Sequence, residues 1–286
     1  MRIERITGTI GAEVTGVDLG AELSASAGGD LAEALRAALG EHLVLFFRDQ
    51  RLDLPALKRL TGAFGDLMAV PYVAPLPDEP YVVAVLKEAS ESGISVFGGE
   101  WHSDFSFLPR PPGGSVLLAV EVPRFGGDTL WANQVLAYET LPDDLRALVD
   151  GRGAVHVGAP YGVKYAPPPD LRVSRSIRIE RGNPEADREV VHPAVRTHPW
   201  TGRKALFVNP IYTTRLDGLS VEESRPVLDR LYRHAVRPEF TCRFRWTPGA
   251  VAIWDNRATL HYAINDYDGQ RRLMYRTTFA GERPFS

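Results

Sequence analysis

Short runs of apolar residues, separated by turn-forming residues, dominate this chain and predict many strands. Residues 3–20 alternate polar and apolar positions between glycines, a pattern typical of short strands joined by turns. The continuous apolar run 43–47 favours a strand that is buried on both faces. The same criteria predict a hairpin over 192–209 and strands at 81–86, 115–122, 128–131, 241–246, 251–254 and 273–279.

Four other segments show the spacing of amphipathic helices. Apolar residues recur at helical intervals over 30–42, where Asp30 is a candidate N-cap. A second helix is predicted over 54–64, with Asp53 as its cap. The remaining two are predicted over 134–150 and 220–236.

This order of elements predicts the fold class. Many short strands with a few peripheral helices are typical of a mainly β fold, a double-stranded β-helix or cupin-like jelly roll. All-β folds can reach about 200–250 residues as one domain. Residues 1–286 are therefore expected to form a single domain.

Two stretches lack a periodic pattern. Residues 87–100 are rich in Ser and Gly and lead into Trp101, so they are either a lid that contacts a substrate or a plain connector. Residues 151–190 are predicted to be loop-like. They include Pro167-Pro168-Pro169 and a mixed-charge segment, 172–188, that is expected on the surface.

Composition narrows the kind of partner. Hydrophobic content of 44% and a formal charge of -3 give no basic excess that would attract nucleic acid or anionic lipid, so a small-molecule partner is expected. The only cysteine, Cys242, cannot form an intrachain disulfide. The start of the chain lacks the apolar core of a signal peptide, and no apolar run reaches the ~18 residues of a membrane span. A cytoplasmic location without a membrane contact is the expectation.

The stretch 101–107 places a histidine and a carboxylate two residues apart among aromatic residues. In an extended strand, side chains two apart point to the same face, so His102 and Asp104 would present a nitrogen and an oxygen to one point. These are two of the three ligands of the 2-His-1-carboxylate triad, which leaves positions open on Fe(II). The site needs one more imidazole.

Six further histidines could supply it. His42 and His234 fall at the ends of predicted helices, where they complement the helix dipole or face solvent. His156 lies in a short β-like run and stays a candidate, as does His261, which follows the 251–254 strand. The other two histidines are His192 and His198. Each precedes a proline at an edge of the predicted hairpin.

Three arginines lie close together downstream of His261, within residues 271–276. On a strand over 272–278, Arg272 and Arg276 share one face, whereas Arg271 points to the other. Two arginines inside a barrel would need anionic partners. On composition alone, the favoured alternative is that both reach solvent or pair with local carboxylates.

Six blocks of residues occur in the order and with the spacing of one known family. Together they resemble the TauD/TfdA family of Fe(II)- and 2-oxoglutarate-dependent dioxygenases, from about Gly11 to Pro284. The resemblance implies a jelly-roll enzyme with Fe(II), 2-oxoglutarate as cosubstrate and O2. The blocks are Trp101-His102-Ser103-Asp104, Gly126-Gly127-Asp128-Thr129-Leu130-Trp131, Thr197-His198-Pro199, Trp254-Asp255-Asn256-Arg257, His261-Tyr262-Ala263 and Gln270-Arg271-Arg272-Leu273-Met274-Tyr275-Arg276.

The resemblance also implies a role for each matching residue. His102, Asp104 and His261 would hold the catalytic iron. 2-Oxoglutarate would chelate that metal, and its distal carboxylate would bind Arg272 and Thr129. A guanidinium group suits this role because it makes a bidentate, charge-assisted pair with a carboxylate.

The implied reaction is a hydroxylation. Oxidative decarboxylation of 2-oxoglutarate would yield succinate and CO2, and Arg276 matches the position that contacts an anionic group of the substrate. If the hydroxylated carbon carries a heteroatom, the product would collapse and cleave that bond. Desaturation and ring closure remain open, whereas halogenation is disfavoured because Asp104 keeps the carboxylate ligand.

Several substrate positions differ from those of the taurine-oxidising members of the family. Val70 replaces a histidine, Val73 replaces a tyrosine, and Gly98 aligns with a loop asparagine. Without these polar partners a sulfonate would be poorly satisfied, which argues against taurine. With Phe97, and with Tyr212 in place of a phenylalanine, these residues indicate a larger, more apolar substrate that carries an acidic group.

Two other interpretations stay open on the residues alone. A non-catalytic jelly-roll protein could bind a metal or a small molecule as a sensor or storage module. A cupin-like isomerase or oxygenase could use the metal without 2-oxoglutarate, but it would leave Arg272 and Thr129 without a role. Because relatives in the family form dimers and tetramers, a homo-oligomer is expected.

Overall fold

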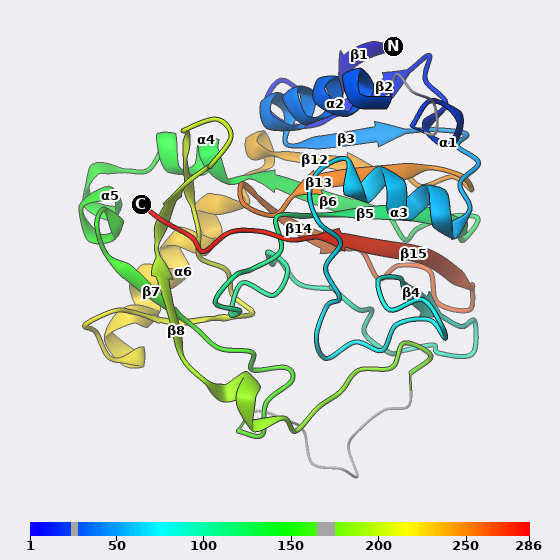
Figure 1. Ribbon diagram of the computed structural model, residues 1–286. Coiled ribbons are helices and arrows are strands. Elements are labelled where there is room, and N and C mark those ends of the chain that lie inside the picture. Colours follow the sequence, from blue (N-terminus) through cyan, green and yellow to red (C-terminus); the bar gives the residue numbers. More distant parts are fainter. Residues whose placement is uncertain (24–27, 165–174) are drawn as a thin grey trace.

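The largest sheet of the molecule runs through its centre (Figure 1). The structure is a computed structural model that describes residues 1–23, 28–164 and 175–286. Neighbouring strands in this sheet are antiparallel except for β2 and β3, which are parallel. In spatial order the sheet contains β1 (Arg2–Arg5), β2 (Ala12–Thr15), β3 (Val44–Phe47), β13 (Val251–Asp255), β5 (Gly114–Glu121), β15 (Arg272–Phe279) and β4 (Val83–Lys87).

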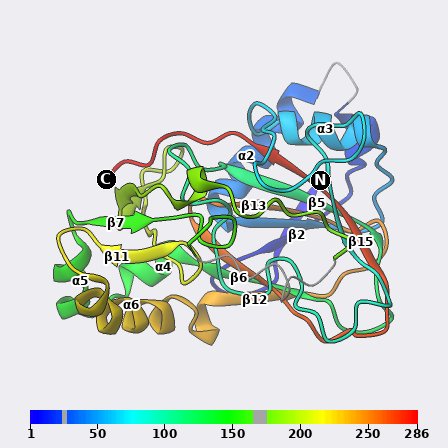
Figure 2. The ribbon, with the colours of Figure 1, turned by 90° about the horizontal axis from the view of Figure 1, so that it is seen from below.

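A second sheet packs against the first across an apolar core. It contains β12 (Thr241–Phe244), β6 (Thr129–Asn133) and β14 (Thr259–Ala263), in that order. Figure 2 shows β6 and β12 on one side of β5 and β13, and α3 (Leu54–Gly62) on the other side. Trp131, Trp254 and Met274, from three different strands, meet between the two sheets. Two sheets around one core form the sandwich of a jelly roll.

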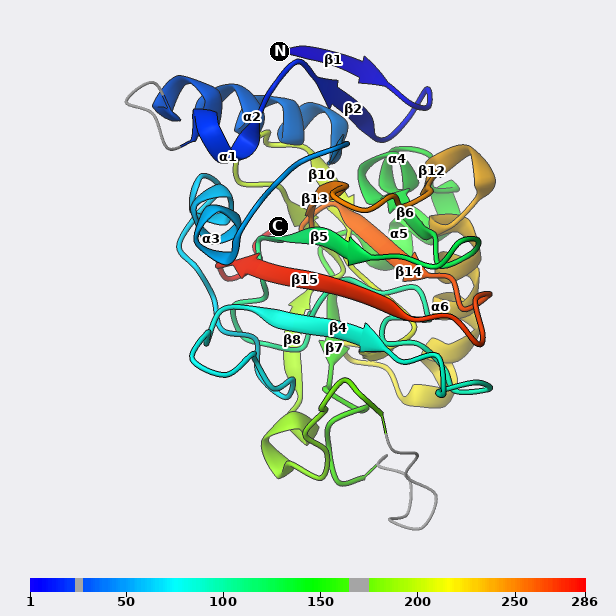
Figure 3. The same cartoon turned by 90° about the vertical axis from the view of Figure 1, so that its right-hand side faces the viewer.

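The central strand β13 is apolar on both faces because each face meets a different core. Ala252 and Trp254 point into the core between the sheets. Val251 and Ile253 point the other way, toward α3 and toward α2 (Gly28–His42). Figure 3 shows β5, β15 and β4 side by side in this sheet. The short helix α1 (Leu19–Glu22) contacts α3.

The remaining elements form a separate layer with its own core. Buried leucines such as Leu145, Leu216 and Leu228 fill it. The long helix of this layer begins with a capping box, in which Ser220 and Glu223 satisfy each other's backbone amides. The elements are α4 (Gln134–Glu139), α5 (Asp143–Val149), β7 (Gly153–His156), η2 (Pro184–Asp187), β8 (Val190–Pro193), β9 (Val195–Thr197), β10 (Lys204–Leu206), β11 (Thr213–Leu216), α6 (Val221–Ala235) and η3 (Pro238–Phe240).

Most elements predicted from the pattern are present, and the mainly β architecture with peripheral helices is confirmed. Asp53 caps α3 through its side chain, as predicted. Asp30 is not a cap, because the helix begins two residues earlier at Gly28 and Asp30 lies in its first turn. The helix predicted over 134–150 is two helices, since Pro142 lacks an N–H and disfavours helical geometry in the residue before it.

Two predictions about irregular segments were wrong. Residues 101–107 are not a strand: His102 makes a single β-bridge, and a turn begins at Asp104. The segment 151–190 is not simply loop-like, because it contains β7 and η2 and begins β8. Pro167-Pro168-Pro169 lies outside the described residues. None of the helices in the described ranges is long and apolar enough to cross a membrane.

Candidate active site

Two backbone segments bring His102 and His261 together. His261 lies in the middle of β14, and its N–H donates to the carbonyl of His102 at 2.8 Å. The N–H of His102 donates back to the carbonyl of His261 at 3.1 Å, which closes the bridge. The two imidazole rings therefore lie side by side, with centroids 4.1 Å apart.

Asp104 completes a compact cluster with these histidines. Its Oδ1 lies 3.6 Å from Nε2 of His102 and 3.6 Å from Nε2 of His261. The three side chains are buried, and their potential ligand atoms all lie within 4.8 Å of one another. The Nδ1 of His102 donates to the carbonyl of Glu100 at 2.7 Å, so Nε2 is free to bind a metal. The structure thus brings together all three predicted ligands.

A turn rather than a strand aims Asp104 at the histidines. The side-chain amide of Asn256 accepts from Trp254 at 2.9 Å and from the backbone N–H of Asp104 at 3.5 Å. Ser103 donates to the carbonyl of Asn256 at 2.7 Å. The next residue, Phe105, is buried with a φ of 45°, a left-handed conformation that costs energy for a non-glycine residue. Packing and these hydrogen bonds hold the turn in place.

The second carboxylate oxygen of Asp104 is held by Arg276. The Oδ2 lies 2.7 Å from the Arg276 guanidinium and accepts from Ser115 at 3.2 Å. Burial would raise the pKa of Asp104, but the charge of Arg276 and then the histidines outweigh it and hold that pKa well below its usual range. Asp104 is therefore ionised, as a metal ligand must be. Burial, followed by the charge of His102, lowers the pKa of His261, which keeps that ring neutral.

A small inner cavity lies behind the cluster. Its volume is about 40 Å³, and Thr129, Leu117, Arg272 and Arg276 are among the residues that line it. Arg272 is buried, its Nε has no hydrogen-bond partner, and no carboxylate among the described residues lies within ion-pair distance. Such a buried, unpaired guanidinium group is costly unless an anion binds to it.

The strand registers place these groups on one interior surface. Thr129 pairs with Ala263, two residues from His261, so Thr129 and His261 point to the same side of their sheet. Arg272 and Arg276 share one face of β15, as predicted, and both are buried. Arg271 points outward instead and pairs with Glu88 and Glu121.

Thr129 has its hydroxyl proton available for a ligand. Its Oγ1 accepts from the indole N–H of Trp246 at 3.0 Å. A hydroxyl that accepts one hydrogen bond can still donate its own proton. Thr129 and Arg272 therefore offer donors to the same small cavity.

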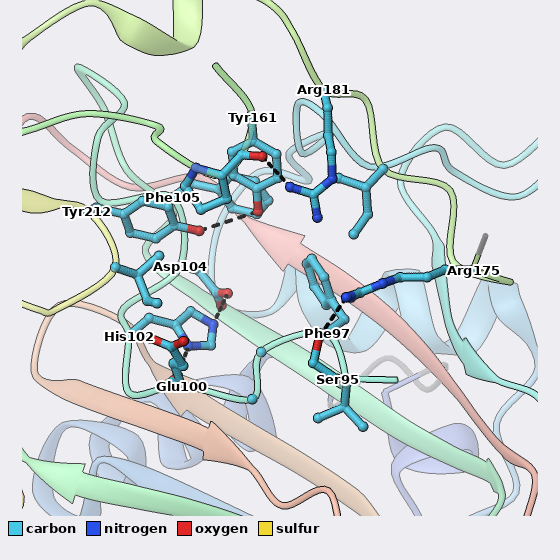
Figure 4. Close-up of a pocket in the computed structure, with 16 residues that line it drawn as sticks. Ser95, Phe97, Glu100, His102, Asp104, Phe105, Tyr161, Arg175, Arg181 and Tyr212 are labelled. Atoms are coloured by element: carbon cyan, nitrogen blue, oxygen red, sulfur yellow. Dashed lines mark hydrogen bonds and ion pairs between the residues drawn. The ribbon is translucent and has the colours of Figure 1, made fainter. Parts of the chain in front are cut away.

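A larger outer cavity opens on the other side of the cluster. Its volume is about 230 Å³, and Figure 4 shows His102, Asp104 and Tyr212 on one side and Arg175 and Arg181 on the opposite side. The walls come from segments 95–100, 160–161, 175–181 and 211–212. A cavity of this size suits a small organic molecule.

Arg276 lines the inner cavity, and the other predicted substrate residues fall into two groups. Phe97 and Gly98 line both cavities, and Tyr212 lines the outer one. Gly98 has a φ of 78°, and an added Cβ would lie 3.1 Å from the His102 ring, so a glycine lets this loop approach the cluster. Val70 and Val73 are not among the lining residues of either cavity but pack in the adjoining apolar cluster, and their contact with a substrate stays a prediction.

The other candidate histidines lie elsewhere. His156 is buried in β7 beside His192 and the hydroxyl of Ser106, and burial lowers its pKa to about 3. His198 binds Asp255 at 3.0 Å, and Asp255 in turn pairs with Arg257. His42 ends α2 and His234 lies in the last turn of α6, as expected.

Three polar residues of the outer cavity are not predicted by the sequence pattern. Tyr161, Arg175 and Arg181 all come from the segment 151–190, for which the pattern predicts a loop. Only the apolar positions Ile177 and Ile179, spaced like an inward-facing strand edge, could have signalled burial there.

This fold and this cluster are those of a 2-oxoglutarate-dependent oxygenase, and comparison with known proteins identifies the family. Residues 2–278 match the taurine catabolism dioxygenase TauD, TfdA family, and the chain belongs to it. The α-ketoglutarate-dependent sulfate ester dioxygenase of Pseudomonas putida is 37% identical over 284 residues, which cover 99% of this chain and 90% of that protein. An alkylsulfatase of Acinetobacter baylyi is 34% identical, with 99% and 86% covered. A crystal structure of a taurine dioxygenase from Burkholderia xenovorans superimposes with a TM-score of 0.81 and 34% identity, covering 100% and 92%.

These similarities settle the class of protein. The chain is a 2-oxoglutarate-dependent dioxygenase that acts on a small organic substrate, and the jelly-roll fold is confirmed. The family membership and the relatives do not support the alternative of a non-catalytic binding protein.

Proposed function

We propose that His102, Asp104 and His261 bind Fe(II) as a 2-His-1-carboxylate triad. The buried cluster supports this proposal, because two imidazoles and one ionised carboxylate are the donor set that leaves coordination positions open on Fe(II). The hydrogen bond from His102 to the carbonyl of Glu100 fixes the ring orientation that a metal would need.

Arg272 and Thr129 would bind the distal carboxylate of 2-oxoglutarate in the inner cavity. The observation that carries the proposal is the buried Arg272, which has no ion-pair partner among the described residues and lies behind the cluster. A carboxylate there would accept a charge-assisted pair from Arg272 and a hydrogen bond from Thr129. When bound, the iron, 2-oxoglutarate and O2 supply the oxidising chemistry that inserts oxygen into a C–H bond.

Arg276 has a double role in this proposal. It holds Asp104 in place through Oδ2, and it would also attract an anionic group of the substrate. Fe(II), Arg272 and Arg276 together carry four positive charges, whereas 2-oxoglutarate and Asp104 carry three negative ones. A substrate with one negative charge would neutralise the loaded site, and electrostatic attraction would favour its binding.

We propose an alkyl sulfate ester as the substrate class, because two of the relatives are named for sulfate ester chemistry. Hydroxylation of the carbon next to the ester oxygen gives a product that carries both OH and sulfate on one carbon. Loss of the hydroxyl proton and cleavage of the C–O bond to sulfate then give an aldehyde and hydrogen sulfate, with succinate and CO2 as the coproducts. Phe97 and Ile211 provide apolar walls for an alkyl chain.

Taurine is not the proposed substrate, although one structural neighbour is named a taurine dioxygenase. The ammonium group of taurine would have to enter an outer cavity whose walls include Arg175 and Arg181. Repulsion between the ammonium group and these two guanidinium groups would disfavour binding. Val70 and Val73 add no polar partner for a sulfonate.

The first experiment is anaerobic. We expect purified protein with Fe(II) and 2-oxoglutarate to develop the weak visible charge-transfer band of that complex, and hexyl sulfate to shift it. Aerobically, succinate and sulfate should then form in equal amounts with hexyl sulfate, and far less succinate should form with taurine. Iron-loaded protein that gives no band would overturn the cosubstrate assignment. Taurine turnover as efficient as that of hexyl sulfate would overturn the substrate class.

We also propose that residues 1–286 act as one cytoplasmic catalytic domain that assembles into a dimer or tetramer. The family match, which spans residues 2–278, supports one continuous catalytic unit. Light scattering of the purified protein tests the assembly, and a single cooperative unfolding transition in calorimetry tests the single domain. A monomeric mass would overturn the assembly, and two independent transitions would overturn the single domain.

A further inference from the structure

We propose that Arg175 and Arg181 form a second anion-binding subsite at the outer end of the substrate cavity, so that the substrate carries two acidic groups separated by an apolar chain. This inference rests on the proposed function, because it places the first acidic group at Arg276. It concerns the end of the cavity opposite the metal cluster.

The two arginines come from one segment and reach the same cavity. Arg175 donates to the hydroxyl of Ser95 at 2.6 Å, and Arg181 donates to the carbonyl of Pro160 at 2.5 Å. Figure 4 shows both side chains extending into the cavity from the wall opposite His102 and Asp104. These neutral partners fix the direction of each side chain without neutralising its charge.

Neither guanidinium has a carboxylate within ion-pair distance among the described residues. The carboxylate of Glu91, which attracts Arg175, is bound instead by the backbone N–H groups of Ser176 and Glu88, each at 2.7 Å. A guanidinium group has five N–H donors, so both arginines keep donors for a ligand.

The charge around the outer cavity also favours a second anion. Asp104 is already paired with Arg276, and Glu100 is the remaining carboxylate among the lining residues. With Glu100, which Figure 4 shows beside His102, Arg175 and Arg181 leave one positive charge in excess in the outer cavity, in addition to the one at the loaded metal site. Partial burial of Arg175 and then the positive charge of Arg181 lower the pKa of Arg175. This is the direction expected when like charges share a site.

Apolar side chains also line the cavity. They are Phe97, which Figure 4 shows between His102 and Arg175, and Ile179, Ile211 and the ring of Phe105. An alkyl chain with an acidic group at each end matches this distribution better than a simple alkyl sulfate, which would leave both outer arginines without an anionic partner. The ligand class is therefore a sulfate ester, or a related anion, with a terminal carboxylate.

The test compares matched substrates. Hexyl sulfate is compared with the sulfate ester of ω-hydroxyhexanoate, and the butyl and octyl homologues extend the series. One charge-assisted pair at the outer end should raise kcat/KM for the carboxylated substrate by about ten- to a hundredfold at the best chain length. In the R175Q/R181Q double variant this preference should fall close to one.

Arg178→Gln is the matched control, because Arg178 lies on the same segment and carries the same charge but is exposed and does not line the cavity. It should keep the wild-type preference. Turnover of hexyl sulfate with no preference for the carboxylated substrate at any length would overturn the second subsite and leave the proposed function standing. A preference that persists in the double variant would overturn the assignment to these arginines.

Ligand binding tests the second subsite independently of turnover. With Mn(II) and N-oxalylglycine in place of Fe(II) and 2-oxoglutarate, calorimetry compares adipate with hexanoate. Adipate should bind to the wild type at least about tenfold more tightly than hexanoate does, and this difference should disappear in R175Q/R181Q. Equal affinities in the wild type would overturn the inference, whereas failure of sulfate ester turnover alone would count against the proposed function.

Discussion

The two ends of the active-site cavity are built in different ways. The inner end is carried by strands: Thr129, His261, Arg272 and Arg276 lie on β6, β14 and β15, whose registers fix their positions. The outer end is carried by a connecting segment that includes Arg175 and Arg181. Strands hold groups within the small tolerances that metal and cosubstrate chemistry need, whereas loops can differ without disturbing the core.

The two ends also differ in how their charges are balanced. Within the inner end, Arg276 is paired with Asp104, but Arg272 four residues earlier on the same face is not. The outer end holds two arginines without a carboxylate partner among the described residues. Arginines without a carboxylate partner thus lie where the proposed ligands bind. The inner end would thus hold the reacting groups, and the outer end would recognise the substrate.

The largest expected effect is at the metal cluster. Asp104→Ala should abolish succinate formation, because it removes the carboxylate that lies between both histidines. Iron content and succinate yield measure the effect, and Asp143→Ala, an exposed substitution on α5, serves as the control. A variant that keeps iron and turnover would contradict the role of Asp104.

A smaller effect is expected at the cosubstrate end. Arg272→Gln should raise the KM for 2-oxoglutarate by about ten- to a hundredfold, the loss expected for one charge-assisted pair. Arg271→Gln is the matched control, since Arg271 is on the opposite face of the same strand. Because Arg272 has no ion-pair partner in the described part of the chain, its replacement should not lower the melting temperature of the protein without ligands. Normal cosubstrate affinity in Arg272→Gln would refute its assigned role.

Acid should weaken the layer that carries the outer end before it affects the large sheet. Burial lowers the pKa of His192 to about 4 and that of His156 to about 3. Both groups bind protons more readily when the chain is unfolded, with a pKa near 6.5, so their stabilising effect is complete above pH 6.5 and is lost as the pH falls toward 4 and then 3.

Urea unfolding at several pH values measures this loss. Each histidine should contribute a slope of up to about 1.4 kcal/mol per pH unit in that range. His192→Gln should remove its share of the slope, because the amide can still donate to the carbonyl of Leu108 but does not titrate. Hydrogen exchange should rise first in β7 and β8. An unchanged slope in His192→Gln would contradict the prediction.

The smallest effect is expected at the tyrosine pair of the outer cavity. The hydroxyls of Tyr161 and Tyr212 lie 3.4 Å apart beside the apolar walls. Tyr212→Phe should raise the KM of the substrate about two- to tenfold, the value of one neutral hydrogen bond, and leave kcat close to that of the wild type. Tyr81→Phe, at an exposed position, is the control. A large loss of kcat would instead place Tyr212 closer to the chemistry than proposed.

The sequence by itself determined the local elements and the inner site. Apolar runs with period-two alternation predict the strands, because each face of a strand must meet a core. The blocks around His102, His261 and Arg272 predict the proposed metal and cosubstrate residues, because this chemistry tolerates few residue types at fixed spacing. The even spacing of Arg272 and Arg276 correctly predicts that they share one face of β15.

Only the tertiary structure decided the rest. Spacing in an extended strand was the wrong reason for the proximity of His102 and Asp104, since a turn held by Asn256 brings them together. Arg175 and Arg181 face the cavity because an irregular segment folds back over it, and irregular segments have no periodicity that a sequence can reveal. The pairing of Arg276 with Asp104, across more than a hundred and fifty residues, likewise depends on strand order, which local patterns do not encode.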